Sequence, residues 1–128
     1  MAGYIDASRV SGEKYIYLTT TGRRTRKPHT VELWFATANR RIYLSHEGKY
    51  TDWMRNILKN DQVEFRTGCT HFEGKTHIIK SGKIFETGKL ALYLKYYGEA
   101  KREVIDDWFS ESTIIEISNI REKSTPTK

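Results

Sequence analysis

The sequence has one cysteine, no long apolar run and none of the glycine-rich loops that usually bind nucleotides, neither GxGxxG nor GxxxxGK(S/T). Cys69 has no partner for an intrachain disulfide, which fits a reducing compartment, and we expect it to be a small buried residue rather than a nucleophile. No segment approaches the ~20 apolar residues of a membrane span. The N-terminal MAGYIDASRV lacks the apolar core of a secretory signal. We therefore expect a cytoplasmic protein without integral membrane association.

Positive charge is in surplus but unevenly distributed. The 22 Lys and Arg against 16 Asp and Glu give a net charge of +6, yet no tract of five basic residues occurs. The segment 99–116 is instead rich in carboxylates. Such a surplus suits nucleic acid, an anionic membrane surface or a small anion. Its concentration in the first two-thirds of the chain favours a local anion site, and we expect no nucleic-acid partner.

The pattern of apolar residues predicts a mainly β (α+β) domain. Alternation and β-forming residues indicate strands over Lys14–Thr20, His29–Thr37, Arg41–His46, Gln62–Thr67, Phe72–Lys80 (continuous or folded at Gly74) and Thr113–Ser118. A chain of 128 residues is normally one domain. We therefore predict a single split β-barrel over residues 1–128, of about six mostly antiparallel strands with short flanking helices, and flexible ends at 1–13 and 119–128.

Two segments have helical spacing. A short helix is predicted over Thr51–Asn60, capped by Thr51 or Asp52. Its apolar stripe comprises Trp53, Met54, Ile57 and Leu58, with Arg55, Asn56 and Lys59 facing away. Apolar residues also recur at helical spacing within 85–97, and Val104–Phe109 suggests a second short helical piece.

The most informative motif is the stretch YLTTTGRRTRKPHTVELWF, residues 17–35. A predicted strand ends in three threonines, turns at Gly22 and passes through Arg23, Arg24, Arg26 and Lys27 into the next strand. Such a hairpin gathers guanidinium groups, hydroxyls and backbone N–H groups, which together suit a phosphate-bearing ligand.

This motif, together with YLSHEGKYTDWMRNILKN, the tyrosine-rich helix and the last strand, resembles the deazaflavin-dependent nitroreductase family. That family belongs to the flavin- and deazaflavin-dependent oxidoreductases with a split β-barrel, which are related to pyridoxamine 5'-phosphate oxidase. The resemblance covers about residues 15–118. It implies an oxidoreductase that transfers a hydride from reduced coenzyme F-420, a deazaflavin, or from FMN to a nitroaromatic, quinone or enone. The positive charge favours F-420, because its oligoglutamate tail is the more anionic.

The resemblance also implies the site residues. The hairpin would hold the phosphate and acidic tail, the segment before the short helix would grip the ring and ribityl part, and the short helix would add an aromatic and an amide. These cofactor-binding residues are Arg23, Arg24, Thr25, Arg26, Lys27, His29, Ser45, His46, Glu47, Gly48, Lys49, Trp53 and Asn56. Tyr93, Tyr96 and Tyr97 would line the substrate side, and either a tyrosine hydroxyl or an ordered water would deliver a proton to the reduced product. The family commonly has glycine at Arg26, whose charge is added where the phosphate is expected.

Other interpretations of the same residues remain open. The barrel could carry a cofactor or lipid without turnover, or bind nucleic acid through basic and aromatic residues that alternate on a sheet face. Trp53, Tyr93 and Tyr97 could be packing residues. His71 and His77 would approach each other if the chain folded back at Gly74, but no third ligand converges, so we predict no metal site. Barrels of this type often pair, and we expect a homodimer.

Overall fold

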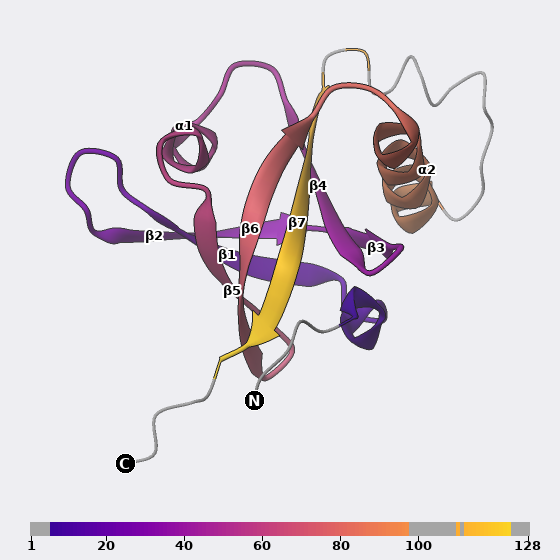
Figure 1. Cartoon of the computed structure of the whole chain (residues 1–128), viewed down its shortest axis with the longest axis horizontal. Coiled ribbons are helices and arrows are strands. Elements are labelled where there is room, and N and C mark those ends of the chain that lie inside the picture. The colour runs from indigo at the N-terminus through magenta and orange to yellow at the C-terminus, as the bar shows by residue number, and fades with distance from the viewer. Residues whose placement is uncertain (1–5, 98–109, 111, 124–128) are drawn as a thin grey trace.

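The computed structural model describes residues 6–97, 110 and 112–123, in which all strands belong to one antiparallel sheet (Figure 1). The strands are β1 (Tyr15–Thr21), β2 (Pro28–Trp34), β3 (Ala36–Ala38), β4 (Arg41–Glu47), β5 (Gln62–Thr67), β6 (Thr70–Ile79) and β7 (Ser112–Glu122). A 3-10 helix covers Ala7–Val10, and the α-helices are α1 (Asp52–Lys59) and α2 (Lys83–Tyr97). The predicted mainly β architecture is confirmed.

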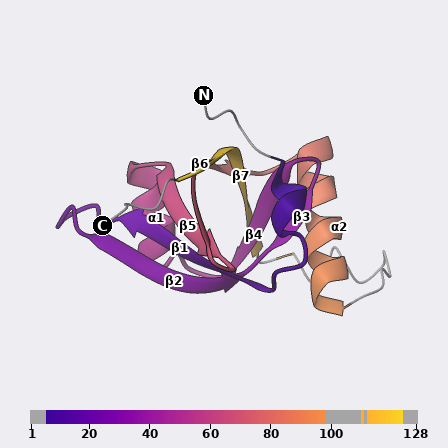
Figure 2. The same ribbon diagram turned by 90° about the horizontal axis from the view of Figure 1, so that it is seen from below.

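The sheet curls because its two edge strands are consecutive in the chain. The strand order is β2-β1-β5-β6-β7-β4-β3, and only Phe35 separates β2 from β3. The predicted strand 29–37 is therefore one extended run that changes neighbour at Phe35, pairing first with β1 and then with β4. Because one run joins both edges of the sheet, the sheet wraps into a barrel (Figure 2).

Alternation along the strands fills the inside of this barrel. In β1, Ile16, Leu18 and Thr20 are buried, whereas the residues between them are partly exposed. The inner core combines them with buried residues of the other strands and of α1, among them Phe35, Ile42, Leu44, Trp53, Met54, Phe65, Phe72 and Ile117. Burial of this apolar surface provides the main driving force for closure.

Helix α2 packs on the outside of the barrel and forms a second core there. Tyr43 of β4 and Ile114 of β7 point outward and pack with Leu92 and Tyr93 of α2. Gly88 permits this contact, because a Cβ at that position would lie 2.6 Å from Cδ1 of Tyr43. Within the described residues, no helix combines the length and apolar character needed to cross a bilayer.

The described structure corrects several expectations. Strand β7 continues past Ser118 to Glu122, and Ala7 is fully buried, so the regular structure reaches into both segments expected to be flexible ends. The strand was predicted too short because Asn119 has a φ of +54°, which interrupts the alternation. Cys69 is exposed rather than buried, because it lies in the tight turn between β5 and β6. The helical piece predicted over 104–109 lies outside the described residues.

Candidate functional site

The basic hairpin loop, residues 22–27 between β1 and β2, is closed by its own backbone. Gly22 N–H donates to the Lys27 carbonyl at 2.7 Å, and Arg26 N–H donates to the Gly22 carbonyl at 2.9 Å. Thr25 Oγ1 accepts from Lys27 N–H at 3.2 Å. A Cβ on Gly22 would lie 2.7 Å from Thr25 Oγ1 and 3.0 Å from the Lys27 oxygen, so glycine is required for this compact turn.

Asn56 of α1 anchors the hairpin loop to the barrel. Its Oδ1 accepts from the Arg23 backbone N–H at 3.2 Å and from Arg23 Nη1 at 3.0 Å. Its Nδ2 donates to Thr20 Oγ1 at 3.0 Å. The prediction that Asn56 faces away from the core was wrong, since the residue is 1% exposed. The apolar Leu58 is the one that faces solvent, at 60% exposure.

Asp52, the first residue of α1, holds the other side of the Arg23 guanidinium. Its Oδ1 lies 3.3 Å from both Nη1 and Nη2 of Arg23. The Arg23 side chain is 23% exposed and that of Asp52 is 73% exposed. Sequence reasoning treated Asp52 only as a helix-start residue, and the four-residue spacing to Asn56 was the signal that both lie on one face of α1.

A pocket of about 210 Å³ opens between the hairpin loop and α1. It brings together five of the predicted cofactor-binding residues with Gly22 and Asp52, which the sequence indicated only as a turn and a helix-start residue. Its lining consists of Gly22, Arg23, Arg24, Thr25, His29, Asp52 and Asn56. Among the described residues, no carboxylate pairs with Arg24. We call this cavity the hairpin pocket.

Arg26 and Lys27 do not line the hairpin pocket. Arg26 has a φ of +63° and lines a separate groove of about 260 Å³, beside Thr19, Thr21 and Glu64 on the outer face of β1 and β5. Lys27 is exposed and contributes only its backbone to the loop. The left-handed turn thus places Arg26 outside the hairpin pocket, and its role toward the phosphate stays a prediction.

The segment from Ser45 to Lys49 leads from the end of β4 toward α1. Gly48 has a φ of +74°, and Glu47, Gly48 and Lys49 are exposed. His46 Nε2 lies 2.9 Å from the Lys49 carbonyl oxygen, so the tautomer with its proton on Nε2 donates to that oxygen. The His46 ring meets Trp53 edge-on, with ring centroids 5.7 Å apart, and Tyr50 at 6.2 Å. This aromatic cluster joins the β4 end to α1, whose next turn carries Asn56.

Tyr93 and Tyr96 of α2 lie outside the hairpin pocket. Tyr93 is buried in the outer core, and Tyr96 stacks on Trp34 with centroids 4.8 Å apart. Trp34 pairs with Tyr15 at the end of the β1–β2 ladder away from the loop, about 20 Å along the strands at ~3.4 Å per residue. Tyr97 ends α2. The described residues thus place Tyr93 and Tyr96 apart from the hairpin pocket.

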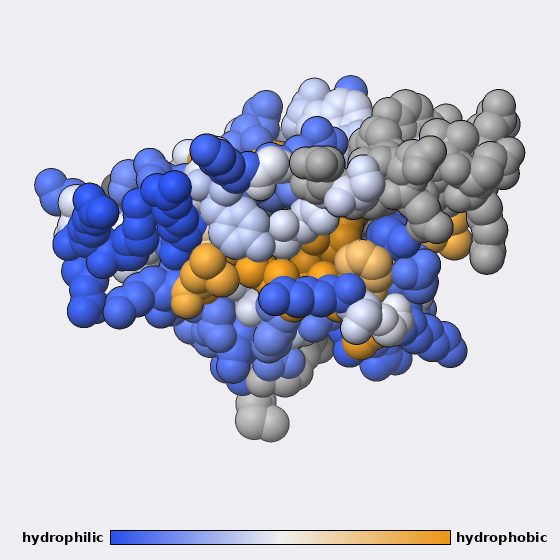
Figure 3. Space-filling view, turned by 90° about the horizontal axis from the view of Figure 1, so that it is seen from above, coloured by the Kyte–Doolittle hydropathy of each residue, from blue (hydrophilic) through white to orange (hydrophobic). Residues whose placement is uncertain are grey.

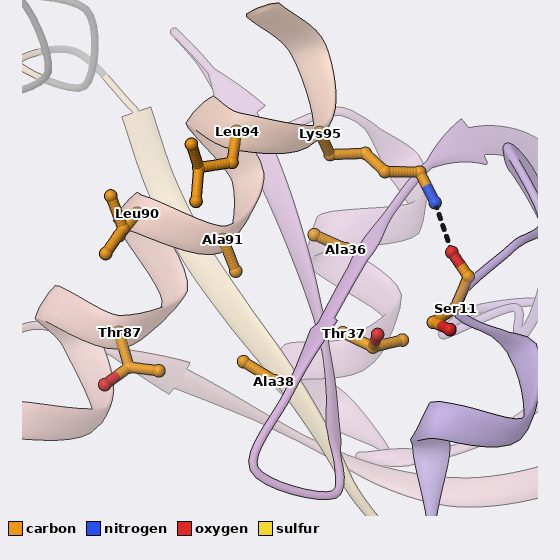
Figure 4. A pocket seen from close by; sticks show the side chains of 9 residues that line it. All are labelled: Ser11, Ala36, Thr37, Ala38, Thr87, Leu90, Ala91, Leu94 and Lys95. Atoms are coloured by element: carbon orange, nitrogen blue, oxygen red, sulfur yellow. Dashed lines mark hydrogen bonds between the residues drawn. The ribbon is translucent and has the colours of Figure 1, made fainter. Parts of the chain in front are cut away.

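A larger, mainly apolar cavity of about 440 Å³ lies between α2 and β3 (Figure 4). Its lining consists of Ser11, Ala36, Thr37, Ala38, Thr87, Leu90, Ala91, Leu94 and Lys95. Lys95 Nζ donates to the Ser11 carbonyl at 2.9 Å and to the Glu13 carbonyl at 2.5 Å, which ties the end of α2 to the N-terminal segment. Neither Tyr93 nor Tyr96 lines this cavity.

The histidines considered as metal ligands do not meet. β6 runs continuously through Gly74 with a bulge, so His71 and His77 are about 20 Å apart along one strand. The described part of the chain contains no group of three His, Cys, Asp or Glu residues arranged to hold a metal ion.

The surface around the hairpin differs in hydropathy from the rest of the same face of the molecule. Seen from above, the hairpin end at the left of the molecule is hydrophilic, and hydrophobic side chains are exposed toward the middle of the same face (Figure 3). An amphipathic ligand with a charged tail and an apolar ring needs these two kinds of surface side by side.

Comparisons with known proteins agree with this geometry. The family model of the F420H2-dependent quinone reductases matches residues 4–87, more than half of the chain. The comparison with curated proteins gives no significant match. Similar solved structures include the conserved hypothetical protein Rv2991 from Mycobacterium tuberculosis, with a TM-score of 0.75 and 18% identity over 95% of this chain and 87% of that one.

Two further structures share the fold. An F420-H2 dependent reductase, FDR-A, has a TM-score of 0.64 and 16% identity over 82% of this chain and 94% of that one. A protein described as a pyridoxamine 5'-phosphate oxidase from Listeria innocua has a TM-score of 0.61 and 16% identity over 92% and 94% of the two chains. These likenesses confirm the predicted split barrel. The match over residues 4–87 shows that the chain belongs to the F420H2-dependent quinone reductase family and is an oxidoreductase whose cofactor is F-420.

Proposed function

We propose that this protein reduces a small organic acceptor, with quinones as the first class to examine, and that the hairpin pocket holds the F-420 phosphate. One observation carries the proposal: Arg24, Thr25 and backbone groups of the hairpin turn line a single pocket. Asn56 fixes this turn in place. The family description supplies the cofactor and the acceptor class.

The residues of the hairpin pocket fit an anionic group. Arg24 is exposed and has no carboxylate partner among the described residues, so its guanidinium is available to an oxygen anion. Thr25 adds a hydroxyl and His29 a ring nitrogen. Charge-assisted hydrogen bonds of this kind contribute roughly 1.5–3 kcal/mol each. A solvated surface loop would not need the closed backbone and the buried amide anchor that this one has.

The ring of the cofactor needs an apolar wall next to the pocket, and His46 and Trp53 are our candidates for it. His46 lies at the end of β4, and Trp53 lies on α1, one turn before Asn56. Their edge-to-face contact fixes both rings. When bound, reduced F-420 supplies the hydride, so the protein has only to bind, orient and exclude water. That Tyr93, Tyr96 and Tyr97 face the acceptor, and that one of them donates a proton, stays a prediction.

Steady-state kinetics of the Arg24→Ala variant test this proposal. Reduced F-420 is oxidised by a soluble quinone under anaerobic conditions, and the reaction is followed by the absorbance of the product cofactor. We expect the KM for reduced F-420 to rise by about tenfold or more, the equivalent of one lost charge-assisted hydrogen bond. The kcat for the quinone should change little, because the phosphate is remote from the reacting ring.

Arg55→Ala provides the matched control. Arg55 is an exposed arginine of α1 that does not line the hairpin pocket, so its removal makes the same change in net charge. A KM that rises equally in both variants would contradict a phosphate site at Arg24. Tight binding of F-420 without oxidation by quinones, nitroaromatics or enones would support a carrier rather than a reductase.

A further inference from the structure

The hairpin pocket contains a carboxylate as well as its arginines. Asp52 lines the cavity with Arg23 and Arg24, and its Oδ1 lies 3.3 Å from both terminal nitrogens of Arg23. One of the two lining guanidinium groups thus already faces a negative charge, and Arg26 and Lys27 are not part of the lining. The pocket is therefore less positive than the sequence of the hairpin indicates.

The Asp52 carboxylate is held beside the pocket by a fixed set of contacts. Its partner Arg23 cannot turn freely, because Nη1 and the backbone N–H of Arg23 both donate to Asn56 Oδ1. Asn56 is in turn buried and bonded to Thr20. An anion that enters the pocket consequently meets the Asp52 carboxylate, whose side chain is 73% exposed, next to a fixed Arg23 guanidinium.

We propose that Asp52 is a specificity-determining residue that makes the hairpin pocket prefer a singly charged phosphodiester to a doubly charged phosphate monoester. This inference rests on the proposed function. F-420 carries its phosphate as a diester with one negative charge, whereas the terminal monoester of FMN carries nearly two at neutral pH. Coulomb repulsion from one carboxylate grows in proportion to the charge of the ligand, so the monoester is penalised about twice as strongly.

The test compares the wild-type protein with the Asp52→Asn variant in binding titrations. FMN, its methyl phosphodiester and uncharged riboflavin, which share one ring and have no acidic tail, are titrated into each protein, and tryptophan fluorescence reports binding; F-420 is titrated into the wild type. Removal of the carboxylate should strengthen FMN binding by about three- to thirtyfold, as expected for one partly screened charge at close range. The gain for the methyl phosphodiester should be about the square root of the gain for FMN, and riboflavin should bind equally to both proteins.

Glu122→Gln is the matched control for net charge. Glu122 is half-exposed and pairs with Arg9 at 3.0 Å, as Asp52 pairs with Arg23, but it lies at the end of β7 and outside the hairpin pocket. This variant should bind all three compounds like the wild type. Circular dichroism of each variant checks that the fold is retained.

Two outcomes would overturn the inference. Either an equal gain for FMN and its methyl phosphodiester in the Asp52→Asn variant, or no gain for FMN, would show that Asp52 does not discriminate by charge. A wild-type protein that does not bind F-420 would instead contradict the proposed function, so the two failures are distinguishable.

Discussion

Arg26 adopts a backbone conformation that suits glycine better than arginine. Its φ of +63° closes the hairpin loop, and a side chain in this region costs roughly 1–2 kcal/mol. The resemblance to the deazaflavin-dependent family pointed to glycine at this position, and the structure supplies the physical reason. The guanidinium that replaces it lies outside the hairpin pocket.

Replacement of Arg26 by glycine should therefore stabilise the protein without loss of cofactor affinity. Relief of the left-handed strain, offset by the greater freedom of glycine in the unfolded chain, should raise the free energy of unfolding by about 0.5–1 kcal/mol. Urea denaturation measures the first effect and F-420 titration the second. Arg24→Gly is the control, because Arg24 has no positive φ and lines the pocket. A variant at Arg26 that is less stable than the wild type would contradict this account.

Tyr43 has a fully buried hydroxyl without a hydrogen-bond partner among the described residues. Burial raises the pKa of this hydroxyl above its usual value of 10.0, while the nearby Arg41 lowers it and Glu116 raises it. Because the folded pKa exceeds the unfolded one, the stability that Tyr43 contributes is complete below pH 10 and is lost as pH rises through the folded pKa.

Tyr43→Phe should alter this alkaline behaviour. At pH 7 the variant should be as stable as the wild type or more stable by up to about 1 kcal/mol, because an unpaired buried polar group is removed. Above pH 10, as pH rises through the folded pKa of Tyr43, the stability of the variant should fall less steeply than that of the wild type. Urea unfolding at pH 7 and at several alkaline pH values checks both parts. Parallel alkaline slopes for the two proteins would show that Tyr43 does not titrate on unfolding.

At the scale of whole elements, the strands were the most predictable part. Alternation placed β1, β4 and β5 within about one residue of their observed bounds, and β6 within two. The closure of the barrel could not be predicted from the sequence, because no residue in 29–37 indicates that the strand changes its partner strand at Phe35. The sequence analysis placed Asn56 on the solvent face because a polar amide on a short helix is usually exposed. In the structure the Asn56 side chain instead forms hydrogen bonds with Arg23 of the hairpin loop and with Thr20 of β1.

The contact between α2 and the barrel depends on one glycine. A Cβ at Gly88 would lie 2.6 Å from Cδ1 of the fully buried Tyr43 and 3.3 Å from Cγ2 of Ile114. Gly88→Ala gains about 1 kcal/mol in helix propensity but forces α2 away from β4, which costs about 1–3 kcal/mol. We expect a net loss of stability of about 1 kcal/mol, measured by thermal unfolding.

Thr87→Ala is the control for that substitution. Thr87 precedes Gly88 on α2 and lines the apolar cavity, where its change to alanine creates no clash. The smaller gain in helix propensity, of at most about 0.7 kcal/mol, should then leave this variant as stable as the wild type or slightly more stable. Gly88→Ala with unchanged stability would show that α2 is not held against β4 at this point.

At the scale of the molecule, the charge distribution and the fold point to one candidate anion site. The sequence indicated the hairpin, and the structure places Arg23 and Arg24 in the pocket and Arg26 in a separate groove, whereas the exposed Lys27 lines neither. That division follows from the left-handed turn and from the anchor at Asn56, neither of which is visible in the sequence. The homodimer stays a prediction, and its test is the molecular mass in solution.

The central claim is that this barrel binds F-420 through the hairpin pocket, and calorimetric titration of F-420 into the wild-type protein and the Arg24→Ala variant tests it most directly. We expect a dissociation constant of about 10 µM or lower for the wild type, weakened about tenfold or more in the variant. Absence of F-420 binding by the wild type, or equal binding by both proteins, would contradict the claim.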